Sequence, residues 1–121
     1  MKQAIIYARV SSSGAQESRQ NTERQVVSLT EYARLNGYEV IKTFEEHISG
    51  GKRNAERTGL LECLNYAKEN KGTTILVSEL SRYGRQIWEV LESIKFCVDN
   101  GINVYFQKEG LELFDGNKVN G

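Results

Sequence analysis

Arginine and serine side chains gather in the polar segments that follow the apolar runs of this sequence. In YARVSSSG, residues 7–14, Arg9 precedes three consecutive serines. Two further segments without acidic residues, 47–55 and 80–88, contribute Lys52, Arg53, Arg82 and Arg85. Guanidinium groups suit phosphate, which they bind through paired N–H donors. The pattern indicates a site that attracts anions. The alternative is that the serine hydroxyls only form hydrogen bonds with backbone amides of a turn.

The elements that must position these side chains alternate between strand and helix. Strands are predicted at 4–8, 38–44, 73–77 and 102–106, with 111–114 as a candidate short fifth, and helices at 22–35, 57–69 and about 84–100. Gly37 and Gly101 are expected to end the first and third helices. This order predicts an α/β fold with a mostly parallel sheet of four or five strands flanked by helices. In such sheets ligands bind beyond the carboxyl ends of the strands, where the polar segments begin.

The strand period distinguishes the three serines. Successive side chains of a strand alternate between the faces of its sheet, so Tyr7, Arg9 and Ser11 share a face if the extended conformation continues. Ser12 would point the other way, and Ser13 lies further into the expected turn. Ser11 is therefore the serine predicted to be in phase with Arg9.

Composition limits the class of protein. The chain has 121 residues, of which 39% are hydrophobic, and 16 Lys and Arg balance 16 Asp and Glu. One domain without a global charge bias is expected. Since no leader is seen and no apolar run approaches the roughly 20 residues of a membrane span, we expect a cytoplasmic protein with no membrane partner. Cys63 and Cys97 lie in apolar helical patterns and are predicted to be buried thiols, not a disulfide or zinc site.

Three motifs together resemble the catalytic domain of the serine recombinases, the resolvase and invertase group. They are YARVSSS at 7–13, ISGGKRNAERTGLLECL at 48–64 and ELSRYGR at 79–85, which match in order and spacing. The resemblance implies a resolvase-like fold and a site-specific DNA recombinase. Its serine would attack a phosphodiester to give a 5′-phosphoserine link and a free 3′-hydroxyl, with no metal and no cofactor.

The resemblance also implies roles for individual residues. The nucleophile of the family maps to Ser11, and its active-site arginines map to Arg9, Arg57, Arg82 and Arg85. Polar residues that border the substrate map to Tyr7, Gln25 and Ser49. Guanidinium groups would stabilise the charge that develops on the phosphate. Two alternatives remain open: the arginines at 82 and 85 also suit a solvated helix surface, and TERQ at 22–25 also fits a capping box.

The sequence departs from the family pattern at two carboxylate positions. Ser81 stands where many relatives carry aspartate in DRLGR, and Glu46 replaces an aspartate common before the SG motif. Any acid-base role of these positions is therefore in doubt. His47 is expected to be a loop residue, and the carboxylates of Glu45, Glu46 and Glu79 are expected to be solvated or paired and not to bind a metal.

The resemblance covers nearly the whole chain. It predicts that residues 1–121 are a catalytic domain truncated before the long assembly helix and the DNA-binding domain of the family. The full-length protein would bind DNA as a dimer and a synaptic tetramer. The main alternative is a non-enzymatic flavodoxin-like or receiver-like phosphate-binding module. A receiver requires a phosphoacceptor aspartate after the third strand, where this sequence has Val77, Ser78 and Glu79.

Overall fold

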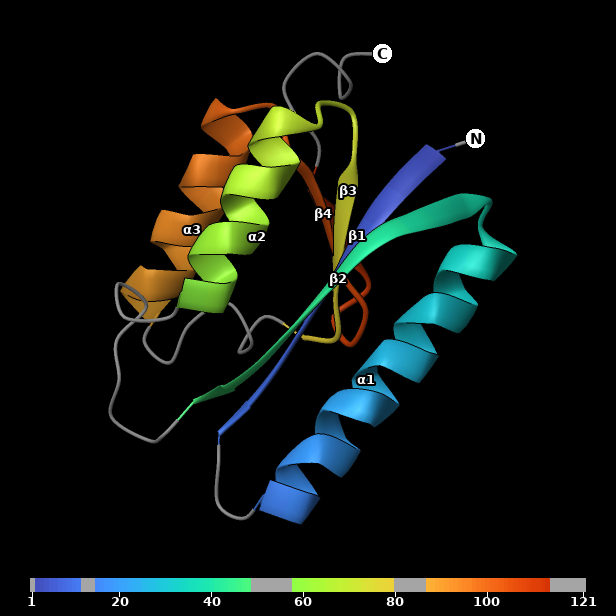
Figure 1. Cartoon of the computed structure of the whole chain (residues 1–121). Helices are drawn as coiled ribbons and strands as arrows, with labels where there is room; N and C mark the ends of the chain where they lie inside the picture. Colours follow the sequence, from blue (N-terminus) through green and yellow to red (C-terminus); the bar gives the residue numbers. More distant parts are fainter. Residues whose placement is uncertain (1, 12–14, 49–57, 80–86, 114–121) are drawn as a thin grey trace.

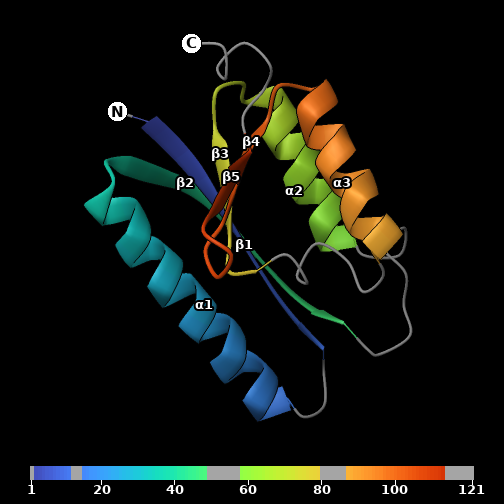
Figure 2. The same cartoon turned by 180° about the vertical axis from the view of Figure 1, so that it is seen from behind.

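A five-stranded sheet with helices on both faces forms the described part of the chain. The computed structural model describes residues 2–11, 15–48, 58–79 and 87–113. Its elements are β1 (Lys2–Ser11), α1 (Ala15–Leu35), β2 (Tyr38–Ile48), α2 (Thr58–Glu69), β3 (Thr74–Val77), α3 (Ile87–Asp99), β4 (Asn103–Phe106) and β5 (Leu111–Leu113). Helix α1 covers one face of the sheet, and α2 and α3 lie side by side on the other (Figures 1 and 2).

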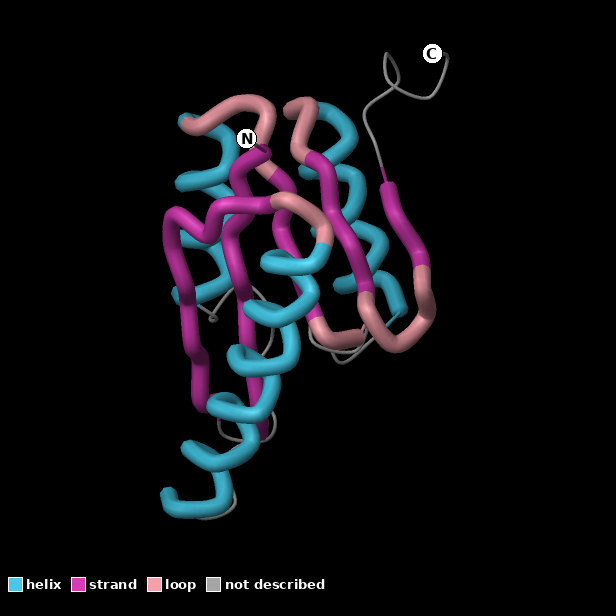
Figure 3. Tube along the Cα trace, turned by 90° about the vertical axis from the view of Figure 1, so that its right-hand side faces the viewer, coloured by secondary structure: helices cyan, strands magenta, loops and turns pink. Residues whose placement is uncertain are grey.

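The strands run in the order β2-β1-β3-β4-β5. All neighbouring pairs are parallel except β4 and β5, which are antiparallel. Figure 3 shows the strands side by side, with α1 in front of them and α2 and α3 behind. The prediction of a mostly parallel sheet flanked by helices is confirmed, and so is the short fifth strand.

Strand β1 supplies side chains to both hydrophobic cores because its residues alternate between the faces of the sheet. Ile5 and Tyr7 are fully buried in the larger core, which lies between the sheet and the helices α2 and α3. Ala4 and Ile6 are fully buried in the smaller core beneath α1. The strand is therefore sandwiched at the centre of the domain.

The predicted ends of α1 and α3, each at a glycine, are confirmed. Gly37 follows α1 and Gly101 follows α3, with φ angles of 76° and 68°. Glycine adopts this left-handed conformation without a steric cost, which lets the chain leave the helix. Neither α1, α2 nor α3, as far as they are described, has the length and hydropathy needed to span a bilayer.

The end of β1, the end of β2 and the start of α1 differ from the sequence-based prediction by three residues or more. β1 continues to Ser11 and β2 to Ile48, both beyond their predicted ends at 8 and 44. The reason is that the backbone ladder between two parallel strands does not require apolar side chains. The expectation that His47 is a loop residue is therefore wrong, because His47 lies in β2 opposite Val10. α1 begins at Ala15 and not at 22. Residues 15–21 have no apolar period, but Ala, Gln, Glu and Arg favour helix intrinsically.

The long β1–β2 pair extends past the neighbouring strand. β1 pairs with β3 only as far as Tyr7, which lies opposite Val77. It pairs with β2 as far as Ser11, which lies opposite Ile48. Among the described residues, positions 8–11 of β1 therefore have a strand neighbour on one side only.

The core beneath α1 predicts that two leucines of this helix contribute very differently to the stability of the protein. Leu29 is fully buried against the sheet, whereas Leu35 is 67% exposed. We expect Leu29→Ala to lower the free energy of unfolding by about 2–5 kcal/mol, since it opens a cavity. Leu35→Ala should change it by about 0.5 kcal/mol or less. Urea denaturation measures both, and equal effects would contradict this packing.

Candidate active site

The carboxyl edge of the sheet receives the polar segments that the sequence singled out. Ser11 is the last residue of β1, and the residue register from Ile5 to Ser11 continues without a shift. Ser11 thus occupies a strand position in phase with Tyr7 and Arg9, as predicted. Residues 49–57 follow the end of β2, and residues 80–86 follow β3 and the described residues Ser78 and Glu79. The predicted site residues Ser49, Arg57, Arg82 and Arg85 lie outside the described residues, as does Ser81.

Arg9 is a buried cation close to the end of β1. Only 5% of its surface is exposed, and it lies opposite Glu46 in the register of the β1–β2 pair. Charge interactions are much stronger in a protein interior than in water. A guanidinium at this depth can therefore attract an anion near Ser11, two residues further along the strand.

The Glu46 carboxylate joins three elements beside this arginine. Its Oε1 atom accepts a hydrogen bond from the Tyr7 hydroxyl at 2.6 Å and from the Leu60 amide at 3.1 Å. Its Oε2 atom accepts a hydrogen bond from the Gly59 amide at 2.7 Å. Carboxylate oxygens at a helix N-terminus accept hydrogen bonds from amides that have no partner within the helix. Glu46 of β2 thereby fixes the start of α2 against β1.

The sequence placed Glu46 only among the solvated or paired carboxylates. Its role as a cap went unnoticed because the capped amide of Gly59 lies 13 residues further along the chain. Capping rules examine only the residues next to a helix. The one available signal in the sequence was the glycine in RTGLL, at the start of a predicted helix. The structure gives its reason, because a Cβ on Gly59 would lie 2.7 Å from the carboxyl carbon of Glu46.

Gln25 of α1 is buried against the backbone of β1 at Arg9. It is 6% exposed, and its amide bonds the main chain of Arg9 twice: Oε1 accepts from the Arg9 amide at 3.2 Å, and Nε2 donates to the Arg9 carbonyl at 3.0 Å. Nε2 also donates to Asn21 Oδ1 at 2.9 Å, and Ser78 Oγ donates to Gln25 Oε1 at 3.3 Å. The capping-box interpretation of residues 22–25 is wrong, because the helix begins at Ala15 and these residues lie inside it.

The two cysteines are buried free thiols, as predicted. Burial raises the pKa of Cys63 well above its usual range, and the nearby Cys97 and Glu46 raise it further. The Cys63 thiol is therefore protonated at neutral pH and is a poor nucleophile.

The described carboxylates do not assemble into a metal site. Glu79 forms an ion pair with Lys108 at 3.3 Å. Among the residues that the structure describes, no group of three His, Cys, Asp or Glu side chains could hold a metal ion.

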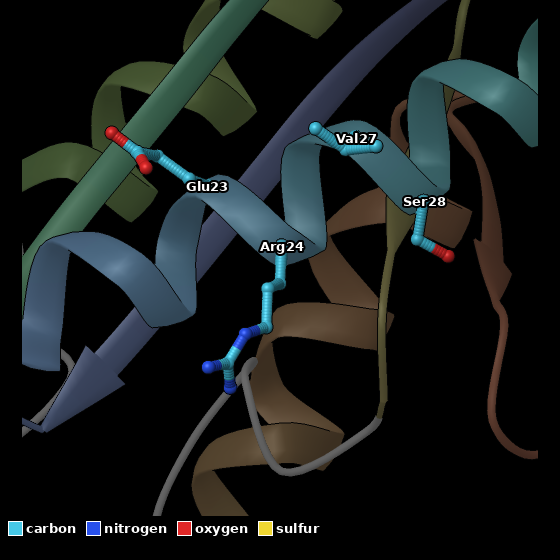
Figure 4. A pocket seen from close by; sticks show the side chains of 4 residues that line it. All are labelled: Glu23, Arg24, Val27 and Ser28. Carbon is cyan, nitrogen blue, oxygen red and sulfur yellow. The ribbon is translucent and has the colours of Figure 1, made fainter.

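A surface hollow of about 520 Å³ lies along α1 and is lined by Glu23, Arg24, Val27 and Ser28 (Figure 4). Figure 4 shows the Glu23 and Arg24 side chains pointing apart. A lining that mixes an acid, a base and an exposed valine does not favour an anion. The hollow is therefore a weaker candidate for a phosphate site than the end of β1.

The close approach of Gly59 and Glu46 predicts that replacing this helical glycine by alanine destabilises the protein. We expect Gly59→Ala to lower the free energy of unfolding by about 1–2 kcal/mol, since the carboxylate must withdraw from its hydrogen bonds. In most helices the same change raises stability by roughly 0.5–1 kcal/mol, so the sign is diagnostic. Urea denaturation of Gly59→Ala, alone and combined with Glu46→Ala, measures the effect. The cost should vanish in the combined variant, and a more stable Gly59→Ala protein would contradict the contact.

Several known proteins are similar to this chain. The family model described as the resolvase N-terminal domain matches residues 4–121. The transposon Tn552 resolvase of Staphylococcus aureus is 32% identical over 109 residues, which cover 90% of this chain and 48% of that protein. The chain spans about half the length of the curated relatives it matches.

Two solved catalytic domains share the fold. The N-terminal catalytic domain of TP901-1 integrase has a TM-score of 0.75 at 29% identity, covering 92% of this chain and 81% of that one. The C-terminal catalytic domain of ISC1926 TnpA, an IS607-like serine recombinase, has a TM-score of 0.71 at 30% identity, covering 86% and 68% respectively. The chain therefore belongs to the resolvase N-terminal domain family, the catalytic domains of the serine recombinases.

Proposed function

We propose that this chain is the catalytic domain of a site-specific DNA recombinase in which Ser11 is the nucleophile. One observation carries the assignment to Ser11: β1 ends on this serine two residues beyond the buried Arg9. The polar segments 49–57 and 80–86 follow strands of the same sheet. The family match supports the reaction class.

The proposed reaction is a transesterification. Ser11 Oγ attacks the phosphorus of a DNA phosphodiester, a serine–phosphorus bond forms, and the bond to the 3′-oxygen breaks. The 3′-oxygen leaves as a hydroxyl after taking up a proton, and the serine proton passes to a base. In the reverse step, a 3′-hydroxyl from an exchanged strand attacks the phosphoserine and reseals the DNA. Because the covalent link conserves the bond energy, no cofactor is required.

Arginines supply the electrostatic stabilisation in this proposal. Arg9, Arg57, Arg82 and Arg85 would stabilise charge on the nonbridging oxygens. Arginine stays protonated and is therefore a poor general base. Ser49 would contact the substrate. Tyr7 is fully buried with its hydroxyl bonded to Glu46, so we assign Tyr7 to the support of the site.

Partners of the whole protein follow from its relatives. Proteins named resolvase, DNA-invertase and integrase are among those that match. We infer that DNA is the substrate, and that sequence-specific reading of DNA is supplied outside residues 1–121. Assembly as a dimer and a synaptic tetramer and a cytoplasmic location are part of the same proposal. The receiver-like alternative is disfavoured, since Ser78 and Glu79 after β3 are bonded to Gln25 and Lys108.

The assignment of Ser11 predicts where DNA becomes attached. In the recombinase that carries this domain, Ser11→Ala should abolish the covalent protein–DNA adduct on a nicked substrate that cannot be resealed. The free energy of unfolding should change by about 0.5 kcal/mol or less. Ser12→Ala and Ser13→Ala are the matched controls and should still form the adduct. Mass spectrometry maps the attached residue, and attachment elsewhere would refute the assignment.

The arginine proposal predicts a metal-independent reaction. Arg82→Ala and Arg85→Ala should each slow adduct formation by about 10² or more, the scale for losing one donor to a developing oxyanion. Arg34→Ala is the control, because Arg34 is exposed and paired with Glu31 in the last turn of α1. Addition of EDTA should leave the rate unchanged. A rate that falls with EDTA and returns with Mg²⁺ would contradict the proposal.

A further inference from the structure

Within the described part of the chain, the end of β1 has no strand neighbour on the side of β3. Pairing with β3 stops at Tyr7, whereas pairing with β2 continues to Ser11. In a parallel strand the N–H and C=O groups of one residue point to the same side. Buried backbone groups need a hydrogen-bond partner, and leaving one without a partner is costly. Beyond Tyr7, such partners must come from something other than β3.

At Arg9 the partner is the side chain of Gln25. Its amide accepts from the Arg9 N–H at 3.2 Å and donates to the Arg9 carbonyl at 3.0 Å, which is what a peptide group of a neighbouring strand would do. Ser78, the residue after β3, donates to the same Gln25 oxygen at 3.3 Å. Gln25 therefore links the ends of β1 and β3 through α1.

The Gln25 amide has no remaining capacity for a further strong hydrogen bond. A carboxamide offers two acceptor lone pairs and two donor hydrogens. The oxygen accepts from Arg9 and Ser78, and the nitrogen donates to Arg9 and Asn21. Gln25 is also buried, with 6% of the residue exposed. These contacts are incompatible with a direct role in holding DNA.

We propose that Gln25 is a positioning residue that replaces the missing strand at the end of β1. By fixing the Arg9 backbone it fixes the place of Ser11, two residues further along, relative to Ser78, which follows β3. The catalytic consequence rests on the proposed recombinase function. Loss of Gln25 should therefore slow the chemical step and leave the affinity for DNA nearly unchanged.

Two variants and one control separate the hydrogen bonds from the packing. Gln25→Met keeps the approximate volume but removes both bonds to Arg9. Gln25→Glu keeps an acceptor for the Arg9 N–H and places a carboxylate oxygen against the Arg9 carbonyl. Ser28→Ala is the matched control. It breaks another hydrogen bond from α1 to the end of a strand, that of Ser28 to Gln107 at 3.2 Å, in an exposed position.

The first measurement is amide hydrogen exchange by NMR on the 121-residue chain. In Gln25→Met the Arg9 amide should exchange at least about tenfold faster, while the Ile5 amide in the same strand keeps its rate. Gln25→Glu should disturb the Arg9 amide less than Gln25→Met does, and Ser28→Ala should not affect it. An unchanged Arg9 amide in a folded Gln25→Met protein would overturn the proposal. If Gln25→Met does not fold, a wild-type adduct rate in Gln25→Glu, whose carboxylate faces the Arg9 carbonyl, would do so.

The second measurement is covalent adduct formation by the recombinase that carries this domain. At saturating nicked DNA, Gln25→Met should form the adduct at least about tenfold more slowly, with a Kd within about twofold of wild type. A Kd that rises while the saturated rate is unchanged would show that Gln25 binds DNA, which would overturn the positioning role. If the wild-type protein forms no adduct at all, the proposed function fails, and the exchange rate of the Arg9 amide still decides the role of Gln25.

Discussion

The parallel pairing of β1 with β2 beyond the end of β3 is the constraint on which the rest of the site depends. It carries the chain in extended form as far as Ser11, through Arg9, although these residues are not apolar. Backbone hydrogen bonds provide this extension because they are indifferent to side-chain type. As far as the chain is described, the same extension leaves one side of the end of β1 without a strand, and a neighbouring element compensates for it.

Two side chains bond to the backbone where regular structure stops. Gln25 bonds the Arg9 backbone where β3 no longer reaches, and Glu46 bonds the first amides of α2, which have no partner within the helix. Each is a polar group at least partly removed from water, and each is satisfied by several partners. Such groups restrict a structure to one arrangement, since leaving any of them without a partner is costly. Both side chains thus bond to residues of β1, Tyr7 and Arg9, that precede Ser11 in the same strand.

The sequence predicted an element correctly wherever its apolar residues recur with the period of that strand or helix. Short apolar runs such as 73–77 predicted buried strands, and the apolar face of 57–69 predicted a covering helix, because burial of these side chains stabilises only one arrangement of each element. The boundaries of β1, β2 and α1 did not follow. Most of their extra residues are polar and are held by the neighbouring strand or by intrinsic helix propensity, which leave no apolar period in the sequence.

The sequence by itself determined the family, the mostly parallel sheet and the position of Ser11 in phase with Tyr7 and Arg9, because motifs and strand period depend on residues close together in the chain. It also identified Gln25 as a residue of interest, but not its contacts. Only the tertiary structure decided that Gln25 bonds the backbone of Arg9 and that Glu46 caps α2 beside Gly59. These contacts join residues 16 and 13 positions apart, and their geometry exists only once the helices have packed on the sheet.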